Sequence, residues 1–182
     1  MLRLSLQAMY LLLPAYLANM APVIVMKWGV LKQLAVPIDR GRKLADGKEL
    51  FGSHKTWRGF LVAVLAGMLM ALIQRALLGV PFFSGLSVLP YDHALLIGFL
   101  MGLGAILGDL AKSFLKRRMG IDPGKPWIPF DQIDFVLGAY GLLALFYLVP
   151  WKLFWVSLLL SFILHVLTNH LSFWLGVRRE RW

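Results

Sequence analysis

The sequence predicts an all-α, polytopic membrane protein of five transmembrane helices, in which loops 1 and 3 form a polar site. Composition is the first reason: 59% of the 182 residues are hydrophobic and 15% are charged, against about 25% charged residues in an average soluble domain. Five apolar stretches also approach the length of about 20 residues that a helix needs to cross a bilayer. Helices are the only consistent interpretation, because a five-strand barrel could not close in lipid.

The predicted spans cover residues 4–25, 59–80, 93–115, 133–149 and 151–177. The first span follows Arg3 in a signal-like way, but its apolar run is longer than a usual signal core and no soluble domain follows, so we expect it to be retained. Pro150 ends the fourth span, which leaves a tight turn as loop 4. There is no internal repeat or low-complexity linker, and residues 1–182 therefore form a single integral-membrane domain.

The positive charge is concentrated in a few segments. Sixteen of the 19 basic residues lie in loop 1 (residues 26–58), loop 3 (residues 112–132) and the tail that carries Arg178, Arg179 and Arg181. These three segments fall on one side of a five-span topology, and the positive-inside rule places that side in the cytoplasm. We therefore expect a cell-membrane protein with its N-terminus outside and its C-terminus cytoplasmic. A net charge of +10 gathered at one membrane face does not indicate a nucleic-acid partner.

The remaining composition narrows the chemistry. The absence of cysteine excludes a disulfide scaffold and a cysteine-ligated metal. We interpret the four histidines as structural or interfacial, and three tryptophans of the last span as interfacial anchors: Trp151, Trp155 and Trp174. Glycines of the second and third spans are interpreted as contacts between packed helices: Gly67, Gly98, Gly102, Gly104 and Gly108.

Polar residues gather at the end of the third span. Asp109, Lys112, Ser113 and Lys116 are spaced so that they share one face of a helix. An acid near the end of a membrane helix, facing the bundle, is costly and suggests a function. The alternative is an ion pair of Asp109 with a nearby lysine that only stabilises the helix end.

Two further acids, Asp131 and Asp134, stand three residues apart at the start of the fourth span. The helix dipole alone could account for acids at that position. Together with Asp109, however, they form a group of carboxylates close to many basic residues, which is what a Mg²⁺–polyphosphate site requires. The intervening loop contains Gly120, Pro123 and Gly124, which would let its backbone approach phosphates closely.

Loop 1 is long for a connection between bundled helices. A generic positive loop that binds lipid headgroups would account for its basic residues, but not for Asp39, Asp46 or the run Gly52-Ser53-His54-Lys55-Thr56-Trp57-Arg58-Gly59. This run is not a nucleotide-triphosphatase P-loop, because it lacks the full spacing and follows no strand.

These motifs, in this order, resemble the CDP-archaeol synthase family (CDP-2,3-bis-O-geranylgeranyl-sn-glycerol synthase), which is related to bacterial CDP-diacylglycerol synthases. The matching stretches are residues 19–22, 37–39, 46–48 and 52–59, then 108–118, 120, 123–124 and 131–134. The segment Pro129-Phe130-Asp131-Gln132-Ile133-Asp134 lacks the His-Gly-Gly of the broader signature, which places the chain nearer the archaeol branch.

The resemblance implies a CTP-dependent cytidylyltransferase of phospholipid biosynthesis that needs Mg²⁺. It would convert a phosphorylated glycerolipid, either an unsaturated archaeol-type ether lipid phosphate or phosphatidic acid, into a CDP-lipid and pyrophosphate. The implied catalytic residues are Asp109, Asp131, Asp134, Lys112 and Lys116, with the three acids as metal ligands. The implied substrate-binding residues are Asp46, Lys55, Thr56, Arg58, Ser113, Arg117, Arg118 and Gly124. CTP, the lipid phosphate and the bilayer would be the partners, and a homodimer is compatible with the sequence.

Three other classes of function stay open from the residues alone. A CDP-alcohol phosphotransferase-like enzyme would also use clustered aspartates, but its pattern needs Asp-Gly-x-x-Ala-Arg, and the run from Asp46 to Phe51 lacks the Ala-Arg. A small non-enzymatic transporter would place charged residues near the middle of the bilayer, whereas Asp109 is near a helix end. A lipid-binding scaffold would not need the carboxylates.

Overall fold

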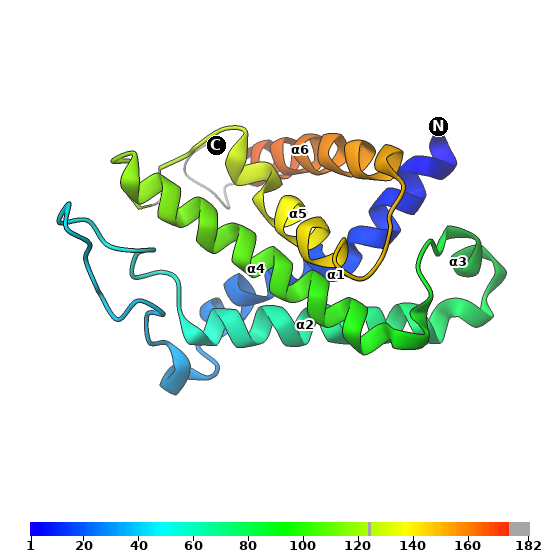
Figure 1. The fold of residues 1–182 in the computed structure, drawn as a ribbon, viewed down its shortest axis with the longest axis horizontal. Helices are drawn as coiled ribbons and strands as arrows, with labels where there is room; N and C mark the ends of the chain where they lie inside the picture. Colours follow the sequence, from blue (N-terminus) through cyan, green and yellow to red (C-terminus); the bar gives the residue numbers. More distant parts are fainter. Residues whose placement is uncertain (124, 175–182) are drawn as a thin grey trace.

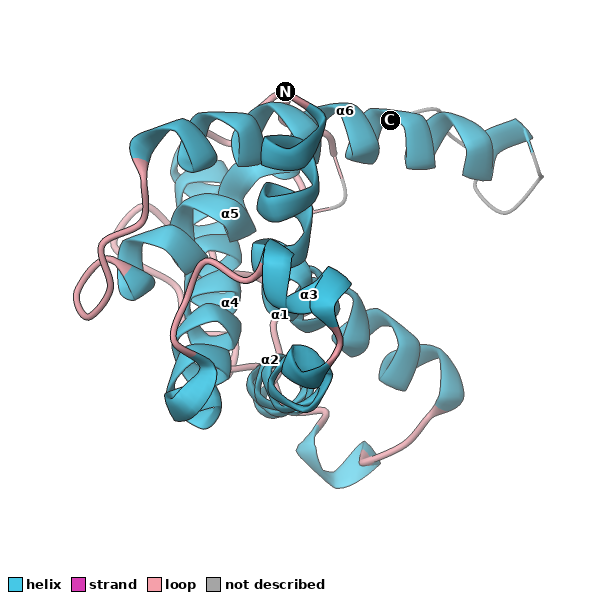
Figure 2. Cartoon of the chain, turned by 90° about the vertical axis from the view of Figure 1, so that its right-hand side faces the viewer, coloured by secondary structure: helices cyan, strands magenta, loops and turns pink. Residues whose placement is uncertain are grey.

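The computed structural model describes residues 1–123 and 125–174, and the regular secondary structure in this part is helical (Figures 1 and 2). The long helices are α1 (Leu2–Trp28), α2 (Trp57–Ala76), α4 (Ala94–Arg118), α5 (Phe130–Leu143) and α6 (Trp151–Trp174). The short elements are η1 (Lys32–Leu34), η2 (Leu77–Gly79), α3 (Pro81–Leu86) and η3 (Tyr91–His93). The prediction of an all-α membrane protein is confirmed.

Four segments of the described chain are long and apolar enough to cross a membrane: Leu2–Trp28, Trp57–Gly79, Tyr91–Arg118 and Trp151–Leu171. Helix α5 is not among them, because its 14 residues reach only about 21 Å, against a hydrocarbon core of about 30 Å. The helix predicted over residues 133–149 is present as α5, but it ends at Leu143, so the predicted end at residue 149 and the tight turn after it were wrong. Hydrophobicity alone cannot distinguish a helix from an apolar connection, and residues 144–150 form such a connection. Pro150 also disfavours helical backbone at the residue before it.

Other boundaries are set by local capping. Helix α2 starts two residues earlier than predicted, because the Thr56 hydroxyl accepts a hydrogen bond from the Gly59 N–H and caps the helix. Helix α1 runs through both of its prolines and ends at Gly29, whose left-handed backbone (φ 66°) closes the last turn. Helix α4 continues to Arg118, so the basic residues after Leu115 are helical. Loop 2 contains α3, which the sequence analysis did not predict.

The helices pack closely where glycines face one another. A Cβ atom on Gly98 of α4 would lie 2.5 Å from the Met68 Cα and 2.6 Å from the Gly67 carbonyl oxygen of α2. At Gly102 it would lie 3.0 Å from the Ala63 carbonyl oxygen. The interpretation of these glycines as helix-packing contacts is confirmed, since only the missing side chains let the two backbones approach so closely.

Helix α6 lies along the outside of the bundle, against α1 and α5 (Figure 2). Two hydroxyl pairs fix it there: Tyr16 with Ser161 at 2.6 Å and Tyr140 with Ser157 at 2.7 Å. Its other face is apolar and exposed, as expected for contact with lipid, through Trp151, Trp155, Leu159, Ile163, Leu167, Leu171 and Trp174. The tail after residue 174, with its three arginines, lies outside the described residues.

The helix ends are sorted along the bundle. The C-terminal ends of α1 and α4 and the N-terminal ends of α2 and α5 lie at the same end of the molecule, at the left in Figure 1. Loop 1 and residues 119–129 of loop 3 are therefore brought together there, as predicted from their charge.

Replacement of Gly98 by alanine should destabilise the bundle, because the new methyl group would force α2 and α4 apart. We expect a loss of about 1–3 kcal/mol, the usual cost of overpacking, seen as a lower Tm of the detergent-purified protein. Gly141→Ala is the matched control, since a Cβ there meets no atom within 4 Å. If the Tm of Gly98→Ala equals that of wild type, the close approach of the two helices is not needed for stability.

Candidate active site

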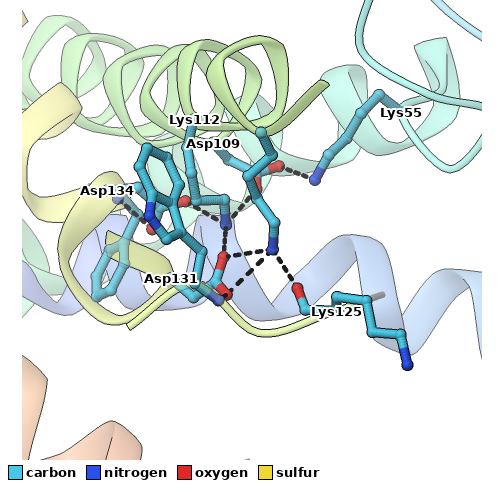
Figure 3. Close-up of polar contacts among 9 residues, drawn as sticks. Lys55, Asp109, Lys112, Lys125, Asp131 and Asp134 are labelled. Atoms are coloured by element: carbon cyan, nitrogen blue, oxygen red, sulfur yellow. Dashed lines mark hydrogen bonds and ion pairs between the residues drawn. The ribbon is translucent and has the colours of Figure 1, made fainter. Parts of the chain in front are cut away.

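Three carboxylates converge on one ammonium group at the end of the bundle that carries loops 1 and 3 (Figure 3). The Nζ atom of Lys112 lies 3.2 Å from Asp109 Oδ1, 3.1 Å from Asp131 Oδ1 and 2.7 Å from Asp134 Oδ2. Two further lysines flank this group. Lys55 bonds to Asp109, and Lys116 lies 3.2 Å from both oxygens of Asp131. We call these six side chains (Asp109, Asp131, Asp134, Lys55, Lys112 and Lys116) the charged cluster.

The spacing along α4 places its members of the cluster on one helix face. Asp109, Lys112 and Lys116 follow one another at intervals of three and four residues, so their side chains point to the same neighbour. This part of the prediction is confirmed. Ser113 and Arg117 are also buried on α4, but within the described residues no hydrogen bond or ion pair joins them to the cluster.

The acids of α5 reach the cluster because α4 and α5 touch at their glycines. A Cβ atom on Gly108 would collide with the Asp134 carbonyl oxygen, and one on Gly138 would collide with the Gly104 carbonyl oxygen. The first turn of α5 is therefore pressed against the last turns of α4. This close approach leaves Asp134 with a side chain only 6% exposed, next to Lys112.

Loop 3 fixes Asp131 from the other side. The Trp127 N–H donates to Asp131 Oδ2 at 2.5 Å, and Lys116 also donates to the Lys125 carbonyl oxygen. The Lys125 ammonium itself points away from the acids (Figure 3). Neither backbone contact could be predicted from the sequence, because both depend on the path of a loop that contains three prolines.

The charges of the cluster balance. Three carboxylates face three ammonium groups, and the side chains of Lys112 and Asp109 are only 14% and 16% exposed. Charged groups can be held away from water only when they are paired and hydrogen-bonded. Each acid here has at least one lysine partner, so the cluster is neutral as a whole.

The three carboxylates supply the oxygen donors that a magnesium site needs, but an ammonium group occupies the point between them. Within residues 1–123 and 125–174, no group of three acidic or histidine side chains is arranged to hold a metal ion. The ammonium of Lys112 lies instead where the three carboxylates converge. Carboxylate oxygens are the ligands that Mg²⁺ prefers, so the chemistry of these donors suits such an ion, although Lys112 occupies the point between them.

A cavity of about 420 Å³ lies between loop 1, α1, α2 and α4, on one side of the cluster. Its polar wall contains Lys55, Arg58 and Asp109, and its apolar wall contains residues of α1 and α4. Arg58 is held by the Val30 carbonyl oxygen at 3.2 Å. Thr56 also lines this cavity, and its hydroxyl is the cap of α2. His54, which the sequence analysis interpreted as structural or interfacial, lines the cavity as well.

A second cavity, of about 460 Å³, lies on the other side of the cluster, between α4 and α5. Its lining is almost entirely apolar, and Lys112 and Asp134 are its charged residues. The apolar lining includes Leu107, Leu115, Leu137 and Leu142. The charged cluster thus contributes side chains to a cavity with one charged wall and to an apolar groove.

Loop 1 is organised by a buried acid that the sequence analysis noticed but did not assign to the site. The carboxylate of Asp39, 5% exposed, accepts backbone hydrogen bonds from Gly41, Phe51 and Gly52 at 2.9–3.1 Å. Burial opposes its ionisation, but the three N–H donors outweigh burial and hold the pKa of Asp39 below its ordinary value. The Asp-x-Gly spacing is typical of such a turn and is the signal from which the role could have been predicted.

Two predicted substrate-binding residues bind each other instead of the cluster. Arg118 Nη1 lies 2.7 and 2.6 Å from the two carboxylate oxygens of Asp46, and Nη2 donates to the carbonyl oxygens of Lys48 and Glu49. The Lys48 N–H and the Arg118 guanidinium lower the pKa of Asp46. This contact joins the tip of loop 1 to the end of α4. Gly124, the remaining predicted binding residue, lies outside the described residues.

Long apolar helices with a partly buried, charge-balanced cluster at one end define this chain as a multi-pass membrane protein. The sequence model of the CarS-like CDP-archaeol synthase family matches residues 1–182. The chain belongs to the CDP-archaeol synthase family.

Individual relatives support this assignment. The CDP-archaeol synthase of Thermofilum pendens is 39% identical over 177 residues, which are 97% of this chain and 80% of the relative. That of Methanocaldococcus jannaschii is 34% identical over 99% of this chain and 98% of its own length. A solved structure, described as an intramembrane enzyme for archaeal membrane lipids biosynthesis, superposes with a TM-score of 0.66 at 33% identity. The superposition covers 89% of this chain and 92% of that chain.

Substitution of Asp39 by asparagine should loosen loop 1, because the amide replaces one oxygen that accepts from Phe51 and Gly52 with a group that cannot accept. We expect a loss of about 1–2 kcal/mol near neutral pH, measured as a lower Tm in detergent. The pKa of Asp39 is lowered in the folded protein. Its contribution is therefore fully present above the unfolded value of 3.8 and is lost as the pH falls through the lower folded value. The difference in Tm between the two proteins should shrink over that window.

Asp92→Asn serves as the control, because Asp92 is exposed at the opposite end of α4. A difference between wild type and Asp39→Asn that stays constant down to the lowest measurable pH would contradict the assigned role of the carboxylate.

Proposed function

We propose that the charged cluster is the active site at which this chain transfers the cytidylyl group of CTP to an archaeol-type ether lipid phosphate. By family membership the chain is a CTP-using cytidylyltransferase of ether-lipid biosynthesis, with CDP-archaeol as its product. The observation that carries the placement of the site is the position of the cluster, between a cavity with one charged wall and an apolar groove. A soluble triphosphate and a membrane-embedded phosphate can meet there.

The two cavities suit the two substrates. The charged wall of the first cavity offers Lys55 and Arg58 to the phosphates of CTP, and this cavity lies beside loop 1. The groove between α4 and α5 offers aliphatic side chains along its length, with Lys112 at its charged edge. A lipid phosphate with its chains in that groove would bring its headgroup to the cluster.

We propose Mg²⁺ as the cofactor, held by Asp109, Asp131 and Asp134. These acids supply hard oxygen donors, and their positions around one ammonium show that they can surround a cation. When bound, the ion would neutralise negative charge on the triphosphate.

The reaction needs little proton transfer. An oxygen of the lipid phosphomonoester, already anionic, attacks the α-phosphorus of CTP. A new phosphorus–oxygen bond forms, the bond from the α-phosphorus to the oxygen bridging to the β-phosphorus breaks, and that oxygen leaves with pyrophosphate. The obstacle is the repulsion between two polyanions. Lys55, Arg58 and Lys116 lower it by positioning both substrates and by electrostatic stabilisation.

The alternatives that the residues left open do not fit as well. Family membership favours lipid-phosphate activation over CDP-alcohol phosphotransfer and over transport. Phosphatidic acid shares the phosphomonoester headgroup, so the two lipids differ in their chains, in the ether or ester linkage and in the configuration of the glycerol. A comparison of the rates with the two lipid phosphates would define which lipid the chain prefers.

We further propose five membrane crossings, with the N-terminus outside and the C-terminus in the cytoplasm. The support is the path of the chain: α5 begins at the end of the molecule that carries loop 3, and α6 begins at the opposite end and runs back (Figure 1). Residues 144–149 extend α5 as an apolar connection and would complete its crossing. The proposed site then faces the compartment that contains CTP. A homodimer stays compatible with this arrangement.

The purified chain with radiolabelled CTP, Mg²⁺ and a set of lipid phosphates should form a labelled CDP-lipid, most rapidly from the unsaturated archaeol-type phosphate. Asp131→Asn and Asp134→Asn should each lower kcat by about 100-fold or more, since each removes a proposed ligand of the Mg²⁺ that would neutralise charge on the reacting phosphates. Asp92→Asn makes the same chemical change far from the cluster and should retain wild-type activity. Formation of no CDP-lipid from any phosphate would refute the proposed function, and full activity of either cluster variant would remove that acid from the site.

A reporter fused after Trp182 should read as cytoplasmic in cells, and one fused before Met1 as external. The basic loops around the site are the physical reason, because they resist transfer across the membrane. The reverse pattern would place the proposed site away from CTP and would contradict the orientation.

A further inference from the structure

Lys112 differs from the other lysines of the cluster. Lys55 contacts Asp109, and Lys116 contacts Asp131 among the acids, whereas Lys112 contacts all three acids. Its ammonium is therefore surrounded by carboxylates from two helices (Figure 3). An ion that took its place would find the same three ligands.

We propose that Lys112 is a built-in counter-ion, which occupies the divalent-cation position until metal and nucleotide arrive and then turns toward the phosphate of the lipid substrate. This inference rests on the proposed function, because it takes the three acids as the ligands of Mg²⁺. Metal and lysine would then compete for the same oxygens, so that the ion binds only when the ammonium leaves.

The charge balance supports competition. With Lys112 in place the cluster is neutral, with three carboxylates and three ammonium groups. A divalent ion added beside the ammonium would leave two unbalanced positive charges in a partly buried site, and cations at such short separation repel. Departure of the ammonium removes that repulsion and frees the oxygens on which the ion depends.

The remaining contacts show which acids can release Lys112. Asp109 keeps Lys55, and Asp131 keeps Lys116 and the Trp127 N–H. Asp134 would keep only the N–H of Phe135 among the contacts of the described residues. The ion would therefore be needed most at Asp134, which cannot remain buried and charged without a partner.

The structure also offers the ammonium a destination. Lys112 lines the apolar groove between α4 and α5, as does Asp134. The flexible stem of a lysine lets its amine turn from one edge of a groove toward a ligand within it. A lipid phosphate at the charged edge of the groove would receive the ammonium that the metal displaces.

The test is to measure Mn²⁺ binding to the detergent-purified full chain by electron paramagnetic resonance, in the absence of nucleotide. We expect Lys112→Gln to bind Mn²⁺ about tenfold or more tightly than wild type, because the competing charge is gone. Lys125→Gln is the matched control. It removes one positive charge from the neighbouring loop, but its ammonium points away from the acids, so its Mn²⁺ affinity should equal that of wild type.

Two results would overturn the inference. One is a folded Lys112→Gln protein that binds Mn²⁺ no more tightly than wild type. The other needs no substitution: acetylation of lysine amines in wild type, read by mass spectrometry, should label Lys112 about threefold faster when Mn²⁺ is added, because the released amine leaves its enclosed position. Labelling of Lys112 that does not change at saturating Mn²⁺ would show that the ion and the ammonium do not compete.

CDP-lipid formation in the same preparations separates this inference from the function on which it rests. An active wild type whose Lys112→Gln variant gains no Mn²⁺ affinity refutes the counter-ion role alone. An inactive wild type refutes the proposed function. A gain of Mn²⁺ affinity together with a fall in kcat supports the inference, whereas a merely structural role of Lys112 would lower both.

Discussion

The partial burial of three carboxylates at the end of a membrane helix bundle is the constraint on which the rest of this structure depends. Each acid must be paired, because an unpartnered charge with little access to water is strongly destabilising. Lys112 pairs with all three from within α4, and the other two lysines come from farther along α4 and from loop 1. The position of Lys55 is therefore an electrostatic requirement of Asp109.

Backbone details at a distance from the cluster serve that requirement. The glycine contacts between α4 and α5 bring Asp134 within reach of Lys112, because a side chain at Gly108 would displace α5. In loop 1, the turn around Asp39 fixes Gly52, three residues before Lys55. The Thr56 cap then sets where α2 begins and so where the preceding lysine can reach. Packing, turn formation and capping thus converge on the placement of a few charges.

Features set by local helix periodicity could be predicted from the sequence, whereas features set by long-range contacts could not. The spacing of Asp109, Lys112 and Lys116 depends only on helix periodicity, and the structure brings them together as expected. Arg118 and Asp46 are 72 residues apart in the sequence, and their pairing depends on how loop 1 folds against the end of α4. No local pattern indicates this contact. The end of α5 at Leu143 was missed for a third reason, because an apolar run has the same composition whether it forms a helix or an irregular connection.

A neutral cluster also changes the meaning of the +10 net charge. Balanced among themselves, the six charged side chains exert little net attraction on a distant triphosphate. The excess charge lies elsewhere, and part of it is on exposed residues of loop 1: Arg40, Arg42, Lys43 and Lys48. Those residues can attract a polyanion to the mouth of the site, but a triphosphate that enters the cluster would leave it negative. On the proposed function, a divalent ion that arrives with the nucleotide restores the balance. On this proposal, the exposed basic residues attract the triphosphate, and the acids of the cluster hold the ion that balances its charge. Both groups of residues are then needed.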